Sequence, residues 1–222
     1  MMYKVIVIRV CGKEFINYSY VVYNAEGIGV LIDPAWELEK IINTIAELKL
    51  DIKAILITHE HLDHTNLAKH TSDYYDAPIY ISAEANRICN ISSKRIMLIN
   101  DETPLLIGTL IIKPLLTPGH TKGSVSYLIN ENLFSGDTLL IEGCGICTDR
   151  TSDPHELFYS LRRLVDIIPL STKIYPGHRY RAEVGREFAY VLNNNIYLNI
   201  TNKEDFIQFR LRNGQEGLMD FL

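Results

Sequence analysis

The segment Thr58-His59-Glu60-His61-Leu62-Asp63-His64 decides how the rest of the chain is interpreted. It follows the apolar run Ala54-Ile55-Leu56-Ile57, which is typical of a buried strand in a covered sheet. In an extended segment, residues two apart point the same way, so His59 and His61 face one point. A turn after them brings the last two potential ligands of the segment to a second point nearby. Imidazole and carboxylate groups suit zinc, with iron as an alternative, so the segment predicts a metal site at a strand end.

Two further histidines extend this pattern. The tripeptide Pro-Gly-His occurs at 118–120 and again at 176–178, each time after a short β-like run. Proline stops a strand and glycine permits a tight backbone, so both tripeptides are expected to present an imidazole at a strand end. The alternative is a solvated loop that happens to be rich in histidine, and His70 and His155, which lie outside any motif, are predicted to be ordinary surface residues.

Composition sets the class of the protein. The chain has 222 residues, 47% hydrophobic and 22% charged, as expected of one globular domain. A formal charge of −5 argues against nucleic acid as the main partner, and no apolar run reaches the length of a membrane span. Four cysteines without a secretory signal predict reduced thiols and a cytoplasmic protein. Cys144 and Cys147 are expected to be small buried thiols, with a redox pair as the alternative.

The hydrophobic pattern predicts strands alternating with helices, so the class is α/β or α+β. Strands are expected at 3–10, 18–23, 28–32, 54–57, 78–82, 105–107, 109–116, 125–129, 133–135 and 173–175. One helix is predicted to start at Pro34 with Asp33 as its N-cap, and another to be opened by a capping box of Thr201 and Glu204. Further helices are expected at 66–70, 84–89 and 154–168, the last capped by Asp153.

The order of potential ligands resembles that of the metallo-β-lactamase superfamily. The pattern continues past the segment to His120, Asp137 and His178, and with the flanking Gly and Pro residues it extends from Asp33 to His178. The resemblance implies a four-layer αβ/βα sandwich with metals at the sheet edge. It also implies a single domain over residues 1–222, with a short helical C-terminal extension from about residue 181.

Position by position, the resemblance implies two Zn²⁺ ions per chain. One ion would be held by His59, His61 and His120. The other would be held by Asp63, His64 and His178, with Asp137 bridging the two ions. A mononuclear Fe²⁺ on His59, His120 and Asp137 is the alternative.

Shorter stretches narrow the resemblance. Segments 135–140 and 143–145 resemble glyoxalase II and the related persulfide dioxygenases, and Tyr180 matches a tyrosine that helps bind glutathione in glyoxalase II. The basic residue expected after Gly-Cys-Gly is Ile146 here, which counts against glutathione. Further stretches are most similar to glyoxalase II-like hydrolases encoded with trans-acyltransferase polyketide synthases, namely segments 33–38, 144–147, 206–210 and 217–221.

The resemblance therefore implies a metal-dependent hydrolase that cleaves acyl thioesters on an acyl carrier protein or coenzyme A, by attack of a hydroxide held between two metals. Asp63 and Asp137 are the expected catalytic residues, and Tyr180 and Arg179 the expected substrate contacts. Basic residues near the last ligand offer a site for a phosphopantetheine phosphate or a helix of the carrier protein, with solvated surface charge as the alternative. They are Arg162, Arg163, Lys173, Arg179, Arg181 and Arg186. The alternative functions are a persulfide dioxygenase, a hydroxyacylglutathione hydrolase and a binding protein that keeps its ligands for structure only.

Overall fold

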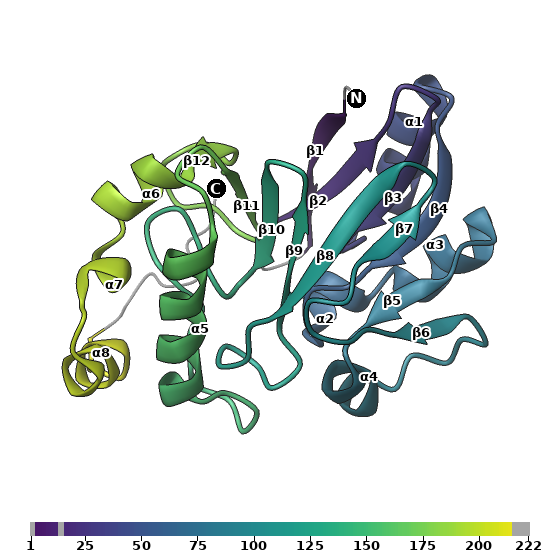
Figure 1. The fold of residues 1–222 in the computed structure, drawn as a ribbon. Helices are drawn as coiled ribbons and strands as arrows, with labels where there is room; N and C mark the ends of the chain where they lie inside the picture. The colour runs from purple at the N-terminus through teal and green to yellow at the C-terminus, as the bar shows by residue number, and fades with distance from the viewer. Residues whose placement is uncertain (1–2, 13–15, 215–222) are drawn as a thin grey trace.

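Two six-stranded sheets face each other in the computed structural model, which describes residues 3–12 and 16–214 (Figure 1). In the first sheet, the three leading strands are antiparallel and the later ones run parallel to the third. In spatial order, this sheet contains β1 (Lys4–Cys11), β2 (Ile16–Tyr23), β3 (Ile28–Ile32), β4 (Asp51–Leu56), β5 (Ile79–Ile81) and β6 (Ile96–Leu98).

The second sheet is built from the later part of the chain. Its neighbouring strands are antiparallel except for one parallel pair, β10 with β11. In spatial order it contains β12 (Arg186–Glu187), β11 (Lys173–Pro176), β10 (Asn132–Gly136), β9 (Val125–Ile129), β8 (Leu110–Leu116) and β7 (Leu105–Ile107). The strands predicted at 105–107 and 109–116 correspond to β7 and β8, which form an antiparallel hairpin that turns at Gly108.

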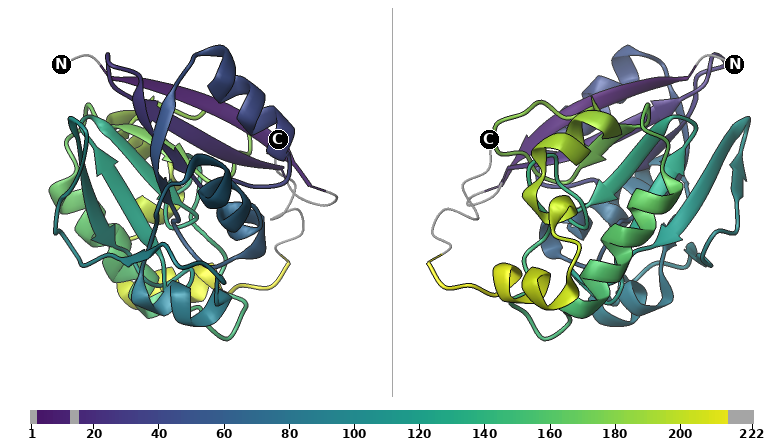
Figure 2. Two further views of the ribbon diagram at one scale, coloured as in Figure 1. Left: turned by 90° about the vertical axis from the view of Figure 1, so that its right-hand side faces the viewer. Right: turned by 60° about the vertical axis from the view of Figure 1, so that its left-hand side comes forward.

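Helices cover the outer face of each sheet (Figure 1). The first sheet is covered by α1 (Leu38–Glu47), α3 (Ala68–Tyr75) and α4 (Ala83–Cys89), and α2 (Leu62–Thr65) is a single turn after β4. The second sheet is covered by α5 (Pro154–Ile167), α6 (Phe188–Asn194), α7 (Ile196–Asn199) and α8 (Lys203–Arg210). In the right-hand view of Figure 2, the green helix α5 and the yellow-green helix α6 lie in front of strands, and the yellow helix α8 lies beside the lower end of α5.

Three buried clusters hold the layers together. Between the sheets, Tyr20 packs against Phe134 with ring centroids 5.3 Å apart, and Phe134 stacks on Tyr175 at 5.1 Å. Outside the first sheet, Val21 packs with Ile41 of α1. Successive residues of β2 thus face opposite buried layers, which is why nearly every residue of this strand is buried. A third cluster joins the second sheet to helices α5 to α8. The predicted mixed α/β class with two sheets is confirmed.

Two predicted helix starts are wrong. Helix α1 begins at Leu38 with Glu37 at its N-cap, because Asp33 takes a left-handed φ of 47° and uses its carboxylate elsewhere. Helix α8 is capped by Asn202, whose side chain accepts from the backbone N–H of Asp205, so no Thr201–Glu204 capping box forms.

The other predicted helices agree with the structure in part. Helix α5 has the predicted cap at Asp153. The helix expected at 66–70 is replaced by α2 and α3, which together extend from Leu62 to Tyr75. Segment 217–221 lies outside the described residues. Within residues 3–12 and 16–214, no helix has the length and apolar character needed to span a membrane.

Candidate metal centre

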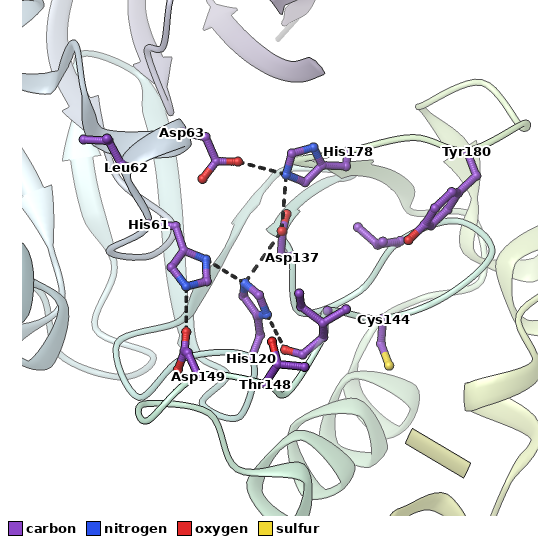
Figure 3. Close-up of a pocket in the computed structure, with 13 residues that line it drawn as sticks. His61, Leu62, Asp63, His120, Asp137, Cys144, Thr148, Asp149, His178 and Tyr180 are labelled. Carbon is purple, nitrogen blue, oxygen red and sulfur yellow. Dashed lines mark hydrogen bonds and ion pairs between the residues drawn. The ribbon is translucent and has the colours of Figure 1, made fainter. Parts of the chain in front are cut away.

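Seven potential ligands converge at the carboxyl ends of four strands. Figure 3 shows those that line the neighbouring cavity: His61, Asp63, His120, Asp137 and His178. Strands β8, β10 and β11 run in the same direction in the second sheet, so the segments that follow them emerge at one edge. The segment after β4 reaches this edge from the first sheet. The side chains brought together are His59, His61, Asp63 and His64 after β4, His120 after β8, Asp137 after β10 and His178 after β11.

Three imidazoles form the first cluster. The Nδ1 atom of His61 lies 3.1 Å from Nε2 of His59 and 3.0 Å from Nε2 of His120. Ligand atoms around a tetrahedral zinc ion are about 3.3 Å apart, given zinc–nitrogen distances of about 2.0–2.1 Å. The spacing of these nitrogens therefore fits one zinc ion.

A carboxylate and two imidazoles form the second cluster. Oδ2 of Asp63 lies 3.3 Å from Nε2 of His178 and 3.6 Å from Nε2 of His64, and the two imidazole nitrogens are 3.4 Å apart. This second set has the same spacing as the first and offers one carboxylate in place of an imidazole, a donor set that also suits zinc.

Asp137 lies between the two clusters. Its Oδ2 is 3.6 Å from Nε2 of His120 and 3.4 Å from Nε2 of His178, and its Oδ1 is 3.7 Å from Nε2 of His64. The buried Oδ1 atom accepts no hydrogen bond from the described residues. A buried carboxylate oxygen without a donor is costly unless a cation lies nearby, so Asp137 fits a position between two metal ions.

Every ring nitrogen that points away from the cluster has a partner of its own. Such outer partners fix the ring orientation and the tautomer of histidines that bind metals. The pairs are His59 Nδ1 with Thr58 Oγ1 at 3.0 Å, His61 Nε2 with Asp149 Oδ2 at 2.9 Å, His64 Nδ1 with Asp33 Oδ2 at 2.9 Å, His120 Nδ1 with the Ile146 carbonyl at 2.8 Å and His178 Nδ1 with the Ile16 carbonyl at 2.8 Å.

Asp33 is a supporting residue that the sequence assigned wrongly to a helix cap. Its Oδ1 accepts from the backbone N–H of Thr58, and its Oδ2 accepts from Oγ1 of Thr58 and contacts His64. The signal was its position: Asp33 directly follows β3, which pairs in parallel with β4, so both strands deliver their next residues to the same edge.

The buried carboxylates of the site are stabilised by positive charge nearby. Burial, followed by the neighbouring imidazoles, lowers the pKa of His59 well below its ordinary value, and burial lowers that of His120 to about 4, so both rings are neutral as metal binding requires. Burial opposes the charge on Asp137, yet the imidazoles of His178, His64 and His120 outweigh it and lower its pKa. Burial also opposes the charge on His64, but Asp63, Asp137 and Asp33 raise its pKa to about 10. A proton on His64 or a metal ion would balance these carboxylates.

A cavity of about 270 Å³ opens onto the ligands (Figure 3). Its metal wall comprises His61, Asp63, His120, Asp137 and His178, and its apolar wall comprises Leu140, Cys144, Gly145, Ile146 and Tyr180. Leu62, Thr148 and Asp149 complete the lining, which contains no Lys or Arg among the described residues. Burial, followed by the charge of Asp137, raises the pKa of Tyr180 to about 12, so its hydroxyl stays neutral and can donate.

The apolar wall is held from outside by the C-terminal helices. Arg210 of α8 is buried and donates to the carbonyls of Cys144 at 3.1 Å and Gly145 at 3.4 Å. Asn195, also buried, donates to the carbonyls of Leu140 and Gly143 at 2.9 and 2.7 Å. No local sequence signal points to these contacts, because each partner lies more than fifty positions away.

Two cysteines and one arginine singled out from the sequence do not belong to the ligand clusters. Cys144 and Cys147 are buried free thiols, as predicted. Arg179 pairs with Glu183 and does not line the cavity.

Other members of the basic set also have partners within the fold. The guanidinium of Arg162 donates to the Leu198 carbonyl at 2.6 Å, and that of Arg163 donates to the Leu116 carbonyl at 2.9 Å. Arg186 lies over the ring of Tyr190. These contacts favour a structural role for the three arginines over a phosphate site.

The family model described as the metallo-beta-lactamase superfamily matches residues 12–178. The chain is 38% identical over 220 residues to the protein described as "Probable polyketide biosynthesis zinc-dependent hydrolase BaeB" of Bacillus velezensis, covering 99% of this chain and 98% of that protein. It is 34% identical to a hydroxyacylglutathione hydrolase of Dictyostelium discoideum, over 90% of this chain and 75% of that protein.

A solved structure shows the same architecture. The crystal structure of ETHE1 from Myxococcus xanthus superposes with a TM-score of 0.81 and 28% sequence identity, covering 97% of this chain and 95% of that one.

Proposed function

The chain belongs to the metallo-β-lactamase superfamily, and from that premise we propose that it is a zinc-dependent hydrolase that cleaves acyl thioesters in polyketide biosynthesis. The proposed substrates carry the acyl group on an acyl carrier protein or on coenzyme A. The observation that carries the proposal is the meeting of two three-ligand clusters at Asp137, on the floor of a cavity with an apolar wall. The relative from B. velezensis, similar over its whole length, supports the polyketide context.

The ligands fit two zinc ions, one on His59, His61 and His120 and one on Asp63, His64 and His178, with Asp137 between them. Zinc ions in such a site polarise a carbonyl group and lower the pKa of a bound water to about 7. Hydrogen bonds to the outward ring nitrogens hold the rings so that their other nitrogens face inward before any metal ion arrives.

Asp63 and Asp137 are the proposed catalytic residues. Both carboxylates lie at the cavity surface, where their oxygens can accept a hydrogen bond from a nucleophilic water and turn its lone pair toward the carbonyl carbon of the substrate. The leaving thiol has an ordinary pKa of about 8.5, so it departs as a thiolate without a strong general acid. The cavity therefore needs no further acid for a thioester.

The apolar wall favours a pantetheine thioester over a glutathione thioester. Glutathione carries two carboxylates, and no Lys or Arg of the described chain lines the cavity. Ile146 stands where the resemblance to glyoxalase II leads one to expect a basic residue, and Asp149 adds a negative charge. A neutral pantetheine arm avoids both the unpaired carboxylates and this repulsion. Tyr180 is the proposed hydroxyl donor to that arm.

The test combines metal analysis with one acyl group presented on four carriers. Purified protein is expected to hold two zinc ions and to hydrolyse the acyl carrier protein, coenzyme A and pantetheine thioesters with higher kcat/KM than the glutathione thioester. The variant Ile146→Lys should shift this preference toward glutathione by adding the missing cation.

Three results would contradict the proposal. Preference of the unaltered protein for the glutathione thioester would indicate a hydroxyacylglutathione hydrolase. Bound iron with oxygen consumption on glutathione persulfide would indicate a dioxygenase. A zinc-saturated protein inert toward every carrier would indicate a binding protein.

A further inference from the structure

A buried asparagine connects the metal centre to the single tryptophan of the chain. Asn17 of β2 is 1% exposed and belongs to neither proposed ligand set. Its Nδ2 atom lies 2.9 Å from Oδ2 of Asp63, and 3.3 and 3.4 Å from the Nε2 atoms of His64 and His178. Its Oδ1 atom accepts from the indole N–H of Trp36 at 2.8 Å. Asn17 therefore touches all three members of the second ligand cluster.

The indole settles which end of the amide faces the metal centre. Amide oxygen and nitrogen are assigned from their partners, and an indole N–H can only donate. The atom beside Trp36 must therefore be the amide oxygen, which turns the NH₂ group toward Asp63. An NH₂ group has no lone pair available for a metal ion, so Asn17 is excluded as a ligand and acts as a donor.

The surroundings hold both residues in place. On either side of Asn17, the Ile16 carbonyl bonds to His178 and the Tyr18 N–H bonds to the Gly177 carbonyl, so the strand is joined to the loop that carries His178. Trp36 takes a left-handed φ of 60°, and its backbone N–H donates to Oδ1 of Asn66. The indole also lies against Gly12, where an added Cβ would come within 2.7 Å of the ring.

We propose that Asn17, oriented by Trp36, is a positioning residue that fixes the Asp63 carboxylate for metal binding. A carboxylate oxygen has two acceptor sites, so Oδ2 of Asp63 takes a hydrogen bond from Asn17 and keeps a lone pair for the cluster. Hydrogen bonds from neutral donors to charged carboxylates are strong and directional. The inference rests on the proposed function, because it assumes that Asp63 binds a metal ion.

Zinc binding to purified, metal-free protein tests the inference. Asn17→Leu keeps the volume and removes the donor, and it should weaken binding of one of the two zinc ions by about 10–100-fold, the usual effect of losing an outer partner of a metal ligand. Trp36→Phe keeps the ring and removes the indole N–H, so it should weaken the same ion to a smaller degree. The double variant should lose no more than Asn17→Leu alone, because both changes interrupt one chain of hydrogen bonds.

A matched control and a spectroscopic reading separate positioning from general damage. Asn24, also buried and also in the β2–β3 hairpin, bonds to Thr109 and to backbone N–H groups away from the metal centre. Asn24→Ala should leave both zinc affinities unchanged. Because the chain has one tryptophan, its emission reports on residue 36 alone, and a zinc-dependent change in the unaltered protein should be reduced in Asn17→Leu.

The outcomes distinguish the two proposals. If the unaltered protein binds no zinc, the proposed function fails. If it binds two ions and Asn17→Leu binds both with unchanged affinity, the positioning role alone is overturned. An equal loss in Asn24→Ala would also overturn it. If Asn17→Leu does not fold, unchanged zinc affinity in Trp36→Phe overturns the role of the indole, and a selective loss supports it.

Discussion

The two walls of the cavity are built in opposite ways. The metal wall consists of charged and polar groups that stand directly at strand ends, and each of its imidazoles is fixed by a second hydrogen bond. Apart from Tyr180, which follows β11, the apolar wall is an irregular stretch between β10 and α5 with few polar side chains. This stretch is held from behind by Asn195 and Arg210. The proposed metal ligands are thus positioned by the sheets, whereas the shape of the opposite wall depends on the C-terminal helices.

The two walls meet beside His120. Ile146 lines the cavity, and its backbone carbonyl contacts Nδ1 of the proposed ligand His120. Gly145 lies against the same ring, because an added Cβ would come within 2.5 Å of that nitrogen. A change in the apolar wall that leaves these contacts intact is expected to leave the metal wall unaltered.

The largest effect is expected from removing a proposed metal ligand. His59→Ala and Asp137→Ala should each lose bound zinc and reduce thioesterase activity by more than about 100-fold, exceeding the loss expected for an outer partner. Zinc content and hydrolysis rate are the measurements. The exposed residue His155 provides the control, because His155→Ala should change neither. Full activity in a zinc-free variant would contradict the proposal that hydrolysis depends on the metal centre.

A smaller loss is expected from Asp33→Asn. Asparagine keeps the shape and tolerates the left-handed backbone at this position, but one of its two acceptor oxygens becomes a donor. His64 or Thr58 then loses its partner, and zinc affinity should fall by about 10–100-fold. Competition with a chromophoric chelator measures the affinity. Unchanged zinc affinity would show that the hydrogen bonds to the outward ring nitrogens do not affect how tightly zinc binds.

Arg210→Met should disturb the apolar wall and leave the metal wall unchanged. The substitution leaves two backbone carbonyls of the apolar wall without their buried donor and should lower the free energy of unfolding by about 1–3 kcal/mol. The loosened wall should raise KM by about tenfold, equivalent to about 1.4 kcal/mol, while both zinc ions stay bound.

Denaturant titration, steady-state kinetics and zinc analysis check this prediction. Arg87→Met, which removes an exposed ion pair with Glu84, is the matched control and should change none of the three quantities. Loss of zinc in Arg210→Met would show that a change in the apolar wall is transmitted to the metal wall through the contacts at His120.

The smallest effect concerns thiol reactivity in the apolar wall. Burial raises the pKa of Cys144 to about 11 and that of Cys147 to about 12, so at pH 8 both thiols are almost entirely protonated. The thiolate is the reactive form, so iodoacetamide at pH 8 should modify the exposed Cys11 before Cys144 and Cys147. The reaction of Cys144 and Cys147 should accelerate only as the pH rises toward their pKa values. Peptide mass mapping follows the order. Early modification of Cys144 would show that this wall opens to solvent.

The sequence predicted the metal wall better than the apolar wall for a physical reason. Metal ligands stand in short motifs at strand ends, so His59 or His178 can be recognised from a few neighbours. Supporting contacts join distant positions: Asp33 meets His64 across 31 positions, and Arg210 meets Cys144 across 66. Such pairs are set by how the two sheets and the helices pack, which no local pattern contains. The wrong cap at Asp33 has the same origin, since its side chain serves the next strand and not the helix that follows.

The arrangement of the strands has a consequence for the lifetime of the folded chain. Each sheet is formed by one continuous half of the sequence, residues 4–98 and residues 105–187, and each ligand cluster draws members from both halves. Neither half contains a complete cluster, so each bound zinc ion would connect the two sheets. Metal supply would then govern how long the molecule survives heat and proteases, as well as how fast it turns over.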